Sequence, residues 1–476
     1  MNAHSLPTRA DDFPAWYAEV VRRGDLAEHS PVRGAMIIRP YGYALWEAIQ
    51  RRLDDRIKAT GHENVYFPLF IPEELFERER ELLEGFAPEV AVVTRAGGKE
   101  LAEPLVVRPT SESMIWATYA RWVRSYRDLP LLYNQWANVV RWELRPRLFL
   151  RTSEFLWQEG HTAHETAEEA RREVLRIADE VYAETFERDL AMPVLRGRKT
   201  PSERFPGAVE TFTLEALMGD GKALQAATSH DLGQKFARAY GVRFAGRDGE
   251  LHHAYATSWG TSTRVVGGLI MCHGDDRGLR LPPQVAPVQA AIVPIPGGDA
   301  GAVHDAAAAL ADSLAGAGIR IRLDAREDVR PGAKFHEWEV KGAPIRLELG
   351  GRDLAAGTAS LVRRDDGERS PVPLAGAAEA VAGALAQIQV ALHEQAIAFR
   401  ERHTLRDPAS YDELREFLAG AGGFAEAAWC GSEQCEKRVK ADARASIRCL
   451  LDAPSGGSCA VCGAAGAERA VWAQSY

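Results

Sequence analysis

The sequence is poor in cysteine and has no long apolar run. Six cysteines in 476 residues are too few to read as a disulfide framework. No stretch approaches the roughly 20 apolar residues of a membrane span. The N-terminal segment, MNAHSLPTRADDFPAW, also lacks the apolar core of a signal peptide. We therefore expect a cytoplasmic protein with no membrane partner.

Glycine-rich phosphate loops are absent as well. The chain contains neither G-x-x-x-x-G-K-[ST] nor G-x-G-x-x-G after an expected strand. Any ATP site must therefore rely on side chains, and arginine suits that task because its planar guanidinium meets phosphate oxygens bidentately. The formal net charge of −9 argues against indiscriminate phosphate binding but leaves room for a local basic patch.

The chain is too long for a single core, so several domains are expected. Residues 1–284 carry antiparallel strand signals, residues 285–395 show a βαβαβ rhythm with a further helix, and residues 396–476 hold four of the cysteines. The patterns in the first domain predict a helix at about 12–30, a helix ending at Gly61, an apolar strand VYFPLF, a charged helix at about 165–190, loop and helix over 207–240, and a strand YATSWGTSTR before an apolar helix.

One stretch, residues 139–164, combines strand-like alternation with many arginines and aromatics. Arg141 and Glu143 lie two apart, so on a strand they share one face. A cation and a carboxylate side by side could hold a phosphate and an amino group of one ligand. The alternative from the pattern alone is an ion-pair ladder on a solvated sheet face.

Three ordered segments resemble the motifs of class II aminoacyl-tRNA synthetases. Residues 40–72, which include Pro68, resemble motif 1; residues 139–164 resemble motif 2; and residues 257–284, where Arg264 enters an apolar helix, resemble motif 3. Four further strings resemble prolyl-tRNA synthetases of the archaeal and eukaryotic-like type: RPTSE, WQEGHTAH, KALQAATSH and HGDDRGLRLPP. The resemblance implies an α+β catalytic domain built on an antiparallel sheet, an α/β anticodon-binding domain and a small α+β zinc-binding C-terminal domain.

The resemblance also implies a reaction and its residues. The family joins L-proline to tRNA(Pro) with ATP and Mg²⁺, through prolyl-adenylate. Arg141 resembles the arginine that holds the amino-acid carboxylate and the α-phosphate, and Arg264 the one on the γ-phosphate, so both are expected to be catalytic. The expected ATP contacts are Arg141, Glu143, Arg151, Thr152, Phe155, Gln225, Thr228, Ser262 and Arg264.

The amino-acid pocket is expected from the same comparison. The proline-binding residues would be Thr110, Glu112, Arg141, Trp157, Glu159 and His230. Proline has a secondary ammonium with two N–H donors, which one carboxylate and one threonine oxygen can satisfy. For Trp157 and His230 the alternative is an ordinary core residue.

The C-terminal cysteines are spaced as Cys430-x4-Cys435 and Cys459-x2-Cys462. Two close pairs of thiolates fit tetrahedral Zn²⁺ in a structural site, and a redox pair is the alternative. Cys272 and Cys449 fall outside this pattern and are expected to pack in the interior.

Partners follow from the resemblance. Motif 1 implies a homodimer, and the α/β domain implies anticodon contacts, with five candidates that could equally be surface charges: Lys334, Glu339, Arg346, Glu348 and Arg352. The chain is expected to lack an editing domain, and its last residue, Tyr476, is expected to fold back onto the catalytic domain. The alternatives are a non-catalytic relative and a relative that charges a carrier protein.

Overall fold

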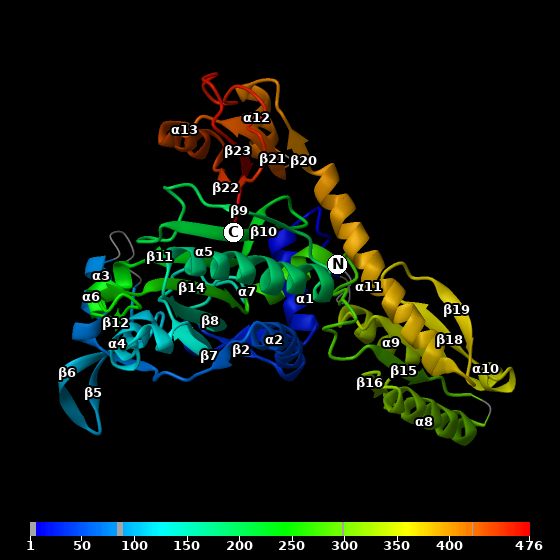
Figure 1. The fold of residues 1–476 in the computed structure, drawn as a ribbon. Helices are drawn as coiled ribbons and strands as arrows, with labels where there is room; N and C mark the ends of the chain where they lie inside the picture. Colours follow the sequence, from blue (N-terminus) through cyan, green and yellow to red (C-terminus); the bar gives the residue numbers. More distant parts are fainter. Residues whose placement is uncertain (1–5, 83–88, 298, 421) are drawn as a thin grey trace.

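The structure is a computed structural model that describes residues 6–82, 89–297, 299–420 and 422–476. Figure 1 shows a central unit, an α/β unit on one side and a small C-terminal unit at the top. The long helix α11 (Ala377–Arg402) runs from the α/β unit to the C-terminal unit. None of the helices in the described ranges has both the length and the apolar character needed to cross a bilayer.

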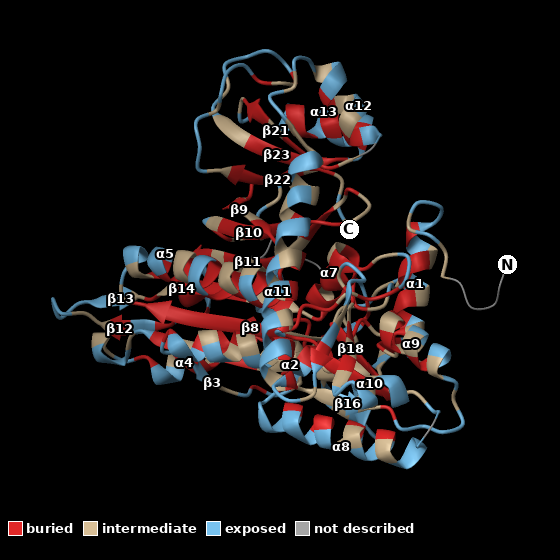
Figure 2. Ribbon diagram, turned by 90° about the vertical axis from the view of Figure 1, so that its right-hand side faces the viewer, coloured by how far each residue is buried: buried red, intermediate tan, exposed pale blue. Residues whose placement is uncertain are grey.

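An 11-stranded sheet forms the centre of the molecule. In spatial order the strands are β20 (Thr404–Arg406), β21 (Phe424–Trp429), β23 (Glu468–Ala473), β22 (Ser446–Leu451), β9 (Val194–Arg198), β10 (Glu210–Leu217), β11 (Ala223–Gly233), β14 (Tyr255–Ser262), β8 (Glu154–His164), β7 (Leu131–Val140) and β3 (Glu63–Asn64). The inner strands, such as β10 and β11, are mostly buried, whereas β3 at one edge is exposed (Figure 2). Neighbours run antiparallel except at β3–β7 and β20–β21. The antiparallel catalytic sheet expected from the sequence is therefore confirmed.

Helices and small sheets surround the catalytic part of this sheet. The helices are α1 (Phe13–Arg23), α2 (Pro40–Ala59), α3 (Glu73–Leu82), α4 (Glu112–Trp122), η1 (Tyr126–Asp128), α5 (Ala167–Arg176), η2 (Ile177–Ala183), η3 (Thr185–Asp189), α6 (Lys235–Tyr240) and α7 (Arg264–His273). The small sheets pair β1 (Ala27–His29) with β2 (Met36–Ile38), β12 (Arg243–Ala245) with β13 (Leu251–His253), and β6 (Lys99–Val107) with both β4 (Phe70–Pro72) and β5 (Val92–Ala96).

Helices predicted from the periodicity of apolar residues are present in the structure. Helix α2 buries its four periodic apolar side chains, Leu45, Ile49, Leu53 and Ile57. The predicted helix at 165–190 is present, although its second half has the wider turns of a π-helix. Helix α1 ends at Arg23 rather than near residue 30, because the chain turns there into strand β1.

Two expectations for the catalytic unit were wrong. Residues 207–240 were expected to be loop and helix, but most of them form strands β10 and β11. The run VYFPLF was expected to be a strand, but only its last residue, Phe70, belongs to one. The backbone of Phe67 instead bonds to side chains: its N–H to Gln135 and its carbonyl to Arg108 Nη1 at 2.6 Å.

The α/β unit contains a five-stranded sheet. Its strands in spatial order are β16 (Ile321–Leu323), β15 (Ala290–Pro294), β17 (Ile345–Leu349), β18 (Thr358–Arg363) and β19 (Arg369–Pro373), and its other helices are α8 (Ala300–Gly316), α9 (Pro331–Val340) and α10 (Gly351–Ala355). The first three strands are parallel, as the βαβαβ pattern predicted. Strands β18 and β19 add an antiparallel hairpin.

The C-terminal unit joins the catalytic sheet directly. It contains α12 (Tyr411–Ala419), α13 (Glu433–Ala443) and strands β20 to β23. Strand β22 pairs with β9 at Leu450 and Arg198. Gly197 makes this close approach possible, because a Cβ at that position would collide with the Leu450 carbonyl and with Cys449. The two units therefore share one continuous sheet.

Candidate functional site

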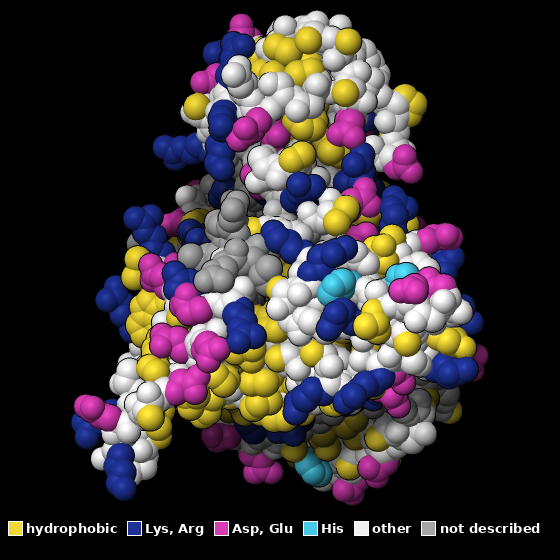
Figure 3. Space-filling view, turned by 60° about the vertical axis from the view of Figure 1, so that its left-hand side comes forward, with side chains coloured by type: hydrophobic (Ala, Val, Ile, Leu, Met, Phe, Trp, Pro, Cys, Tyr) yellow, Lys and Arg dark blue, Asp and Glu magenta, His cyan; other side chains and the backbone are white. Residues whose placement is uncertain are grey.

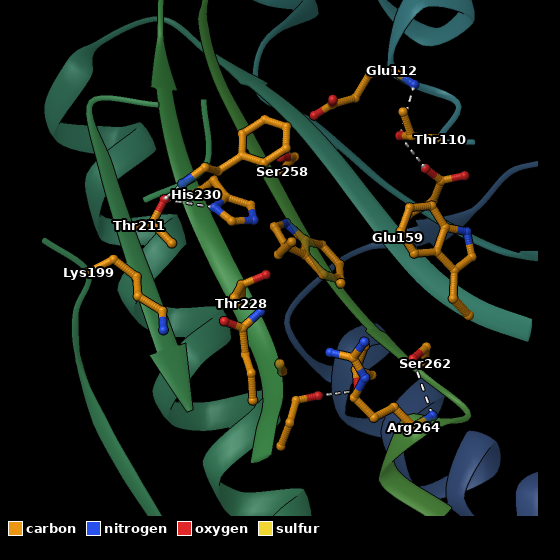
Figure 4. A pocket seen from close by; sticks show the side chains of 18 of the residues that line it. Thr110, Glu112, Glu159, Lys199, Thr211, Thr228, His230, Ser258, Ser262 and Arg264 are labelled. Carbon is orange, nitrogen blue, oxygen red and sulfur yellow. Dashed lines mark hydrogen bonds between the residues drawn. The ribbon is translucent and has the colours of Figure 1, made fainter. Parts of the chain in front are cut away.

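A cavity of about 350 Å³ opens on strands β8, β10, β11 and β14 and on the segment 199–206. Figure 4 shows Thr110 and Glu112 at one end, and Ser262 and Arg264 at the other. Eleven of the residues expected from the sequence line this cavity: Thr110, Glu112, Arg141, Phe155, Trp157, Glu159, Gln225, Thr228, His230, Ser262 and Arg264. The fold therefore brings together residues that are more than 150 positions apart in the chain.

Two buried carboxylates mark the first end of the cavity. The carboxylate of Glu159 accepts from Ser111 Oγ at 2.6 Å, from Gln135 Nε2 at 2.9 Å and from Thr110 Oγ1 at 3.3 Å. His161 Nε2 lies 3.1 Å from the same carboxylate. Burial would raise the pKa of Glu159, but the hydrogen bond and charge of His161 and the hydrogen bonds from Ser111 lower this pKa to about 2.

The pKa of Glu112 is shifted in the opposite direction from that of Glu159. Burial raises the pKa of Glu112, the charge of His161 opposes that rise, and the negative charge of Glu159 adds to it. The nearest His161 nitrogen, Nδ1, lies 3.8 Å from the Glu112 carboxylate. The hydrogen bonds of Glu159 thus hold the loop that carries Thr110. A cation that enters the cavity would instead stabilise the ionised form of Glu112.

Aromatic side chains form the walls between the two ends. The indole Nε1 of Trp157 is buried and has no acceptor within the described residues. His230 shares a hydrogen bond of 2.9 Å with Thr211 Oγ1, and its ring lies 4.8 Å from that of Phe205. Burial and the charge of His161 lower the pKa of His230 to about 3, so its ring is neutral at physiological pH.

Two arginines dominate the rest of the cavity. Arg141 Nε donates to the Pro109 carbonyl at 3.0 Å, and its guanidinium lies 5.1 Å from the ring centre of Trp157 and 5.8 Å from that of Phe155. Arg264 Nε donates to the Leu150 carbonyl at 3.1 Å. Burial, followed by the charges of Arg151 and Arg141, lowers the pKa of Arg264 to about 10. Partly buried positive charges that repel one another favour an anionic ligand.

Three expected ATP contacts lie outside the cavity lining. Arg151 Nε is 3.6 Å from a carboxylate oxygen of Glu143, and the Arg151 side chain is 55% exposed. The buried hydroxyl of Thr152 donates to the Glu154 carbonyl at 2.7 Å. These side chains lie at the base of the loop between β7 and β8.

Part of the cavity lining was not expected from the sequence. The segment 199–206 contributes Lys199, Glu203, Arg204, Phe205 and Pro206, and the sheet adds His161, Thr211, Ser258 and Trp259 among others. His161 lies inside the string WQEGHTAH, so its position in the cavity could have been predicted from that motif. The segment KTPSERFP reads as an ordinary polar loop, and only the tertiary fold places it on the cavity.

The four C-terminal cysteines converge as their spacing predicted. Their Sγ atoms all lie within 4.8 Å of one another, with 3.7 Å between Cys430 and Cys435 and between Cys430 and Cys462. A tetrahedral Zn²⁺ with bonds of about 2.3 Å would place its sulfurs about 3.8 Å apart. The donor set therefore fits zinc. Cys449 is buried and Cys272 half-buried, both outside this cluster.

The structure also separates the anticodon candidates. A cavity of about 220 Å³ in the α/β unit is lined by Glu339 and Arg346, together with Arg277, Arg363, Arg364 and Arg369. Lys334 is buried and donates to the Asp324 carbonyl at 3.0 Å, and Glu348 is buried between Arg346 and Arg369. Arg352 is exposed on α10 and does not line this cavity.

Comparisons with known families agree with this architecture. Residues 94–272 match the tRNA synthetase class II core domain (G, H, P, S and T), residues 289–383 match the anticodon binding domain, and residues 411–476 match the prolyl-tRNA synthetase C-terminal domain. The fold is thus that of a class II aminoacyl-tRNA synthetase.

Comparison with individual relatives identifies the family within this class. The chain is 50% identical to a proline--tRNA ligase of Roseiflexus castenholzii, with complete coverage of both chains, and 53% identical to that of Rubrobacter xylanophilus, with 99% of this chain and 98% of the relative covered. The crystal structure of prolyl-tRNA synthetase from Cryptosporidium parvum, complexed with halofuginone and AMPPNP, matches with a TM-score of 0.94, 37% identity and 99% of each chain covered. The chain belongs to the proline--tRNA ligase family.

Proposed function

We propose that this enzyme attaches L-proline to tRNA(Pro) in two steps within the large cavity. A carboxylate oxygen of proline attacks the α-phosphorus of ATP, the bond to the bridging oxygen breaks, and pyrophosphate leaves. A ribose hydroxyl at the tRNA terminus then attacks the prolyl carbonyl, and AMP departs with the electrons of the broken bond. Neither step requires a side-chain nucleophile, so catalysis rests on positioning and electrostatic stabilisation.

Proline is assigned to the end of the cavity that carries the carboxylates. Glu112 and Thr110 would accept the two N–H donors of the secondary ammonium, while Trp157 and the neutral His230 would border the apolar ring. Glu159 contributes by holding Thr110 and Ser111 in place, which its hydrogen bonds support. This changes the expected role of Glu159 from direct proline contact to support of the loop.

ATP is assigned to the end that carries the arginines. Arg141 would bridge the proline carboxylate and the α-phosphate, and Arg264 would hold the γ-phosphate. The remaining assignments are Phe155 on adenine, Glu143 on its amino group, and Arg151, Thr152, Gln225, Thr228 and Ser262 around the nucleotide. Mg²⁺ would enter on the phosphates and neutralise their charge, since it needs only one or two protein oxygens.

A single observation carries this proposal: one cavity has the buried carboxylates Glu112 and Glu159 at one end, half-buried Arg264 at the other, and half-buried Arg141 in its lining. Proline-dependent exchange between ATP and pyrophosphate tests it, with alanine and cysteine as comparison substrates. Proline should give the largest kcat/KM, and Arg141→Ala should abolish exchange while the protein stays folded. Exchange that does not depend on proline would contradict the assignment. Neither alternative, the non-catalytic relative or the carrier-charging one, is favoured by any observation.

The zinc site is proposed to be structural. Cys430, Cys435, Cys459 and Cys462 would hold one Zn²⁺, which would cross-link the chain around the start of α13. The cluster belongs to the C-terminal unit rather than to the large cavity, so the ion would stabilise the fold without taking part in the reaction.

The arginine-rich cavity of the α/β unit is the proposed site for anticodon bases. Proline anticodons end in two guanines; arginine donates to the O6 and N7 acceptors of guanine, while a carboxylate accepts from N1 and N2. Glu339 and Arg346 combine these groups in one cavity. Arg346→Ala should lower aminoacylation of tRNA(Pro) while proline-dependent pyrophosphate exchange remains near normal.

We further propose that the enzyme is a cytoplasmic homodimer. Large apolar side chains are exposed on and near the motif 1 segment, with Tyr66 73%, Trp122 45% and Phe70 44% exposed. Figure 3 shows hydrophobic side chains gathered on one face, bordered by both acidic and basic side chains. Because an isologous contact would bury such a surface twice, a second copy of the chain is the proposed partner. Sedimentation at micromolar concentration should give the mass of two chains, and a fully active monomer would contradict the proposal.

A further inference from the structure

The C-terminal unit contacts the segment that borders the large cavity. Glu436 on α13 is 7% exposed, and its Oε2 atom accepts from Thr200 Oγ1 at 2.9 Å and from Ser202 Oγ at 2.7 Å. The two hydroxyls are themselves 3.0 Å apart. One carboxylate oxygen therefore fixes two residues of the catalytic unit from more than 230 positions away in the chain.

These two residues begin a turn that leads into the cavity. The Thr200 carbonyl accepts from the backbone N–H groups of Glu203 and Arg204, at 3.1 and 2.9 Å. Both of those residues line the cavity, as do the two that follow. A displacement of Thr200 would therefore also move Glu203 and Arg204 in the cavity lining.

The turn ends against a wall of the proposed proline site. The N–H of Phe205 donates to Thr211 Oγ1 at 3.1 Å, and the same hydroxyl bonds to His230. The Phe205 and His230 rings lie 4.8 Å apart. The position of the turn thus determines how closely Phe205 meets His230.

The start of the segment is also held from the C-terminal unit. Lys199 Nζ lies 2.9 Å from a carboxylate oxygen of Glu215, which is fully buried. Arg448 on β22 lies 3.1 Å from the other oxygen of that carboxylate. Lys199 is therefore fixed before the turn begins, and Glu436 provides the second restraint, on the turn itself.

We propose that Glu436 is a positioning residue for proline binding: from α13 it fixes the turn at Thr200 and Ser202, and so sets the wall formed by Phe205 and His230. This rests on the proposed assignment of proline to that end of the cavity. Affinity for the amino acid then depends partly on a side chain outside the catalytic unit.

Pyrophosphate exchange with matched variants tests the proposal. Glu436→Ala should raise KM for proline about tenfold, because hydrogen bonds to a charged group are lost, while KM for ATP and kcat stay within about twofold. Glu436→Gln keeps an acceptor oxygen and should restore KM for proline. The control, Glu433→Ala, lies on the same helix, where Glu433 is exposed and pairs with Lys437 at 2.9 Å. It should leave KM unchanged.

Hydrogen exchange adds a measurement that does not depend on activity. Backbone amides in 199–206 should exchange faster in Glu436→Ala than in the wild type or in Glu433→Ala. Ser202→Ala, which removes the contact from the other side without touching α13, should raise KM for proline by about twofold to fivefold. It serves as the test if Glu436→Ala does not fold.

The outcomes separate the two proposals. A wild-type enzyme that shows no proline-dependent exchange would contradict the assigned function. A wild-type enzyme that exchanges normally, with an unchanged KM for proline in Glu436→Ala and Ser202→Ala, would overturn only the positioning role. Equal effects of Glu433→Ala and Glu436→Ala would overturn it as well, since they would indicate a general effect on α13.

Discussion

The last two residues of the chain should matter for proline activation. The hydroxyl of Tyr476 donates to Asp220 Oδ2 at 2.7 Å, and Lys222 Nζ lies 5.2 Å from the tyrosine ring centre. Burial and the charge of Asp220 raise the pKa of Tyr476, so the hydroxyl remains a donor at any working pH. A hydrogen bond to a charged group contributes about 1.5–3 kcal/mol and a cation–π contact about 0.5–1 kcal/mol.

This anchor faces the loop that holds a proposed catalytic arginine. Tyr476 and Leu150 line the same cavity, of about 150 Å³, and the Leu150 carbonyl accepts from Arg264. Tyr17, on another wall, donates to the Leu148 carbonyl at 2.8 Å. If the tail orders this loop, the contacts of Tyr476 also help to stabilise the loop conformation in which the Leu150 carbonyl accepts from Arg264. A transfer of about 1.4 kcal/mol would be a tenfold effect on rate.

Deletion of Ser475 and Tyr476 should therefore lower kcat/KM in proline-dependent pyrophosphate exchange about tenfold or more. Tyr476→Phe keeps the ring in the cavity and should give a smaller loss. Zinc content and sedimentation should not change in either variant, which would show that the fold is intact. Wild-type exchange by the shortened enzyme would refute the reasoning.

Three further predictions follow from the sites described above. Purified enzyme should contain about one Zn²⁺ per subunit, and Cys459→Ser should lose it; full occupancy in that variant would contradict the four-cysteine site. Because burial raises the pKa of Glu112 and its proposed contact with the proline ammonium requires the ionised form, kcat/KM for proline should fall towards acid pH more steeply than kcat/KM for ATP, and identical profiles would argue against that role. Alanine should be activated measurably, since each missing methylene is worth only about 1–3 kcal/mol, and alanyl-tRNA should persist; its rapid hydrolysis by the pure enzyme would show an editing activity.

Sequence patterns predicted elements whose signal is local. Helix α2 carries apolar residues at helical spacing, and the four cysteines stand in two close pairs, so the helix and the convergence of the cysteines were both predicted correctly. Strand β11 was missed because it is flanked by glycines and carries many small or polar residues, such as Thr228. Thr228 lines the cavity, and a strand beside a polar cavity lacks the clean alternation by which a sheet face is recognised. Strand β10 does alternate polar and apolar residues over 211–216, so its signal was present in the sequence.

Long-range contacts were beyond prediction from one sequence. Nothing in KTPSERFP indicates that Glu436 holds its hydroxyls, because each partner alone is an ordinary surface residue type. In the same way, the motif placed Glu159 at the proline site, but only the fold shows that its carboxylate is already occupied by Thr110 and Ser111.

The shared sheet has a consequence for how the chain can be divided. Strand β9 pairs with β10 on one side, and on the other side it pairs with β22 of the C-terminal unit at Arg198 and Leu450. A shortened chain ending near residue 403 would leave the open side of β9 as an unpaired edge, with backbone donors and acceptors that could recruit a strand from another molecule. The C-terminal unit thus covers part of a strand edge that would otherwise be open to pairing with a strand of another molecule.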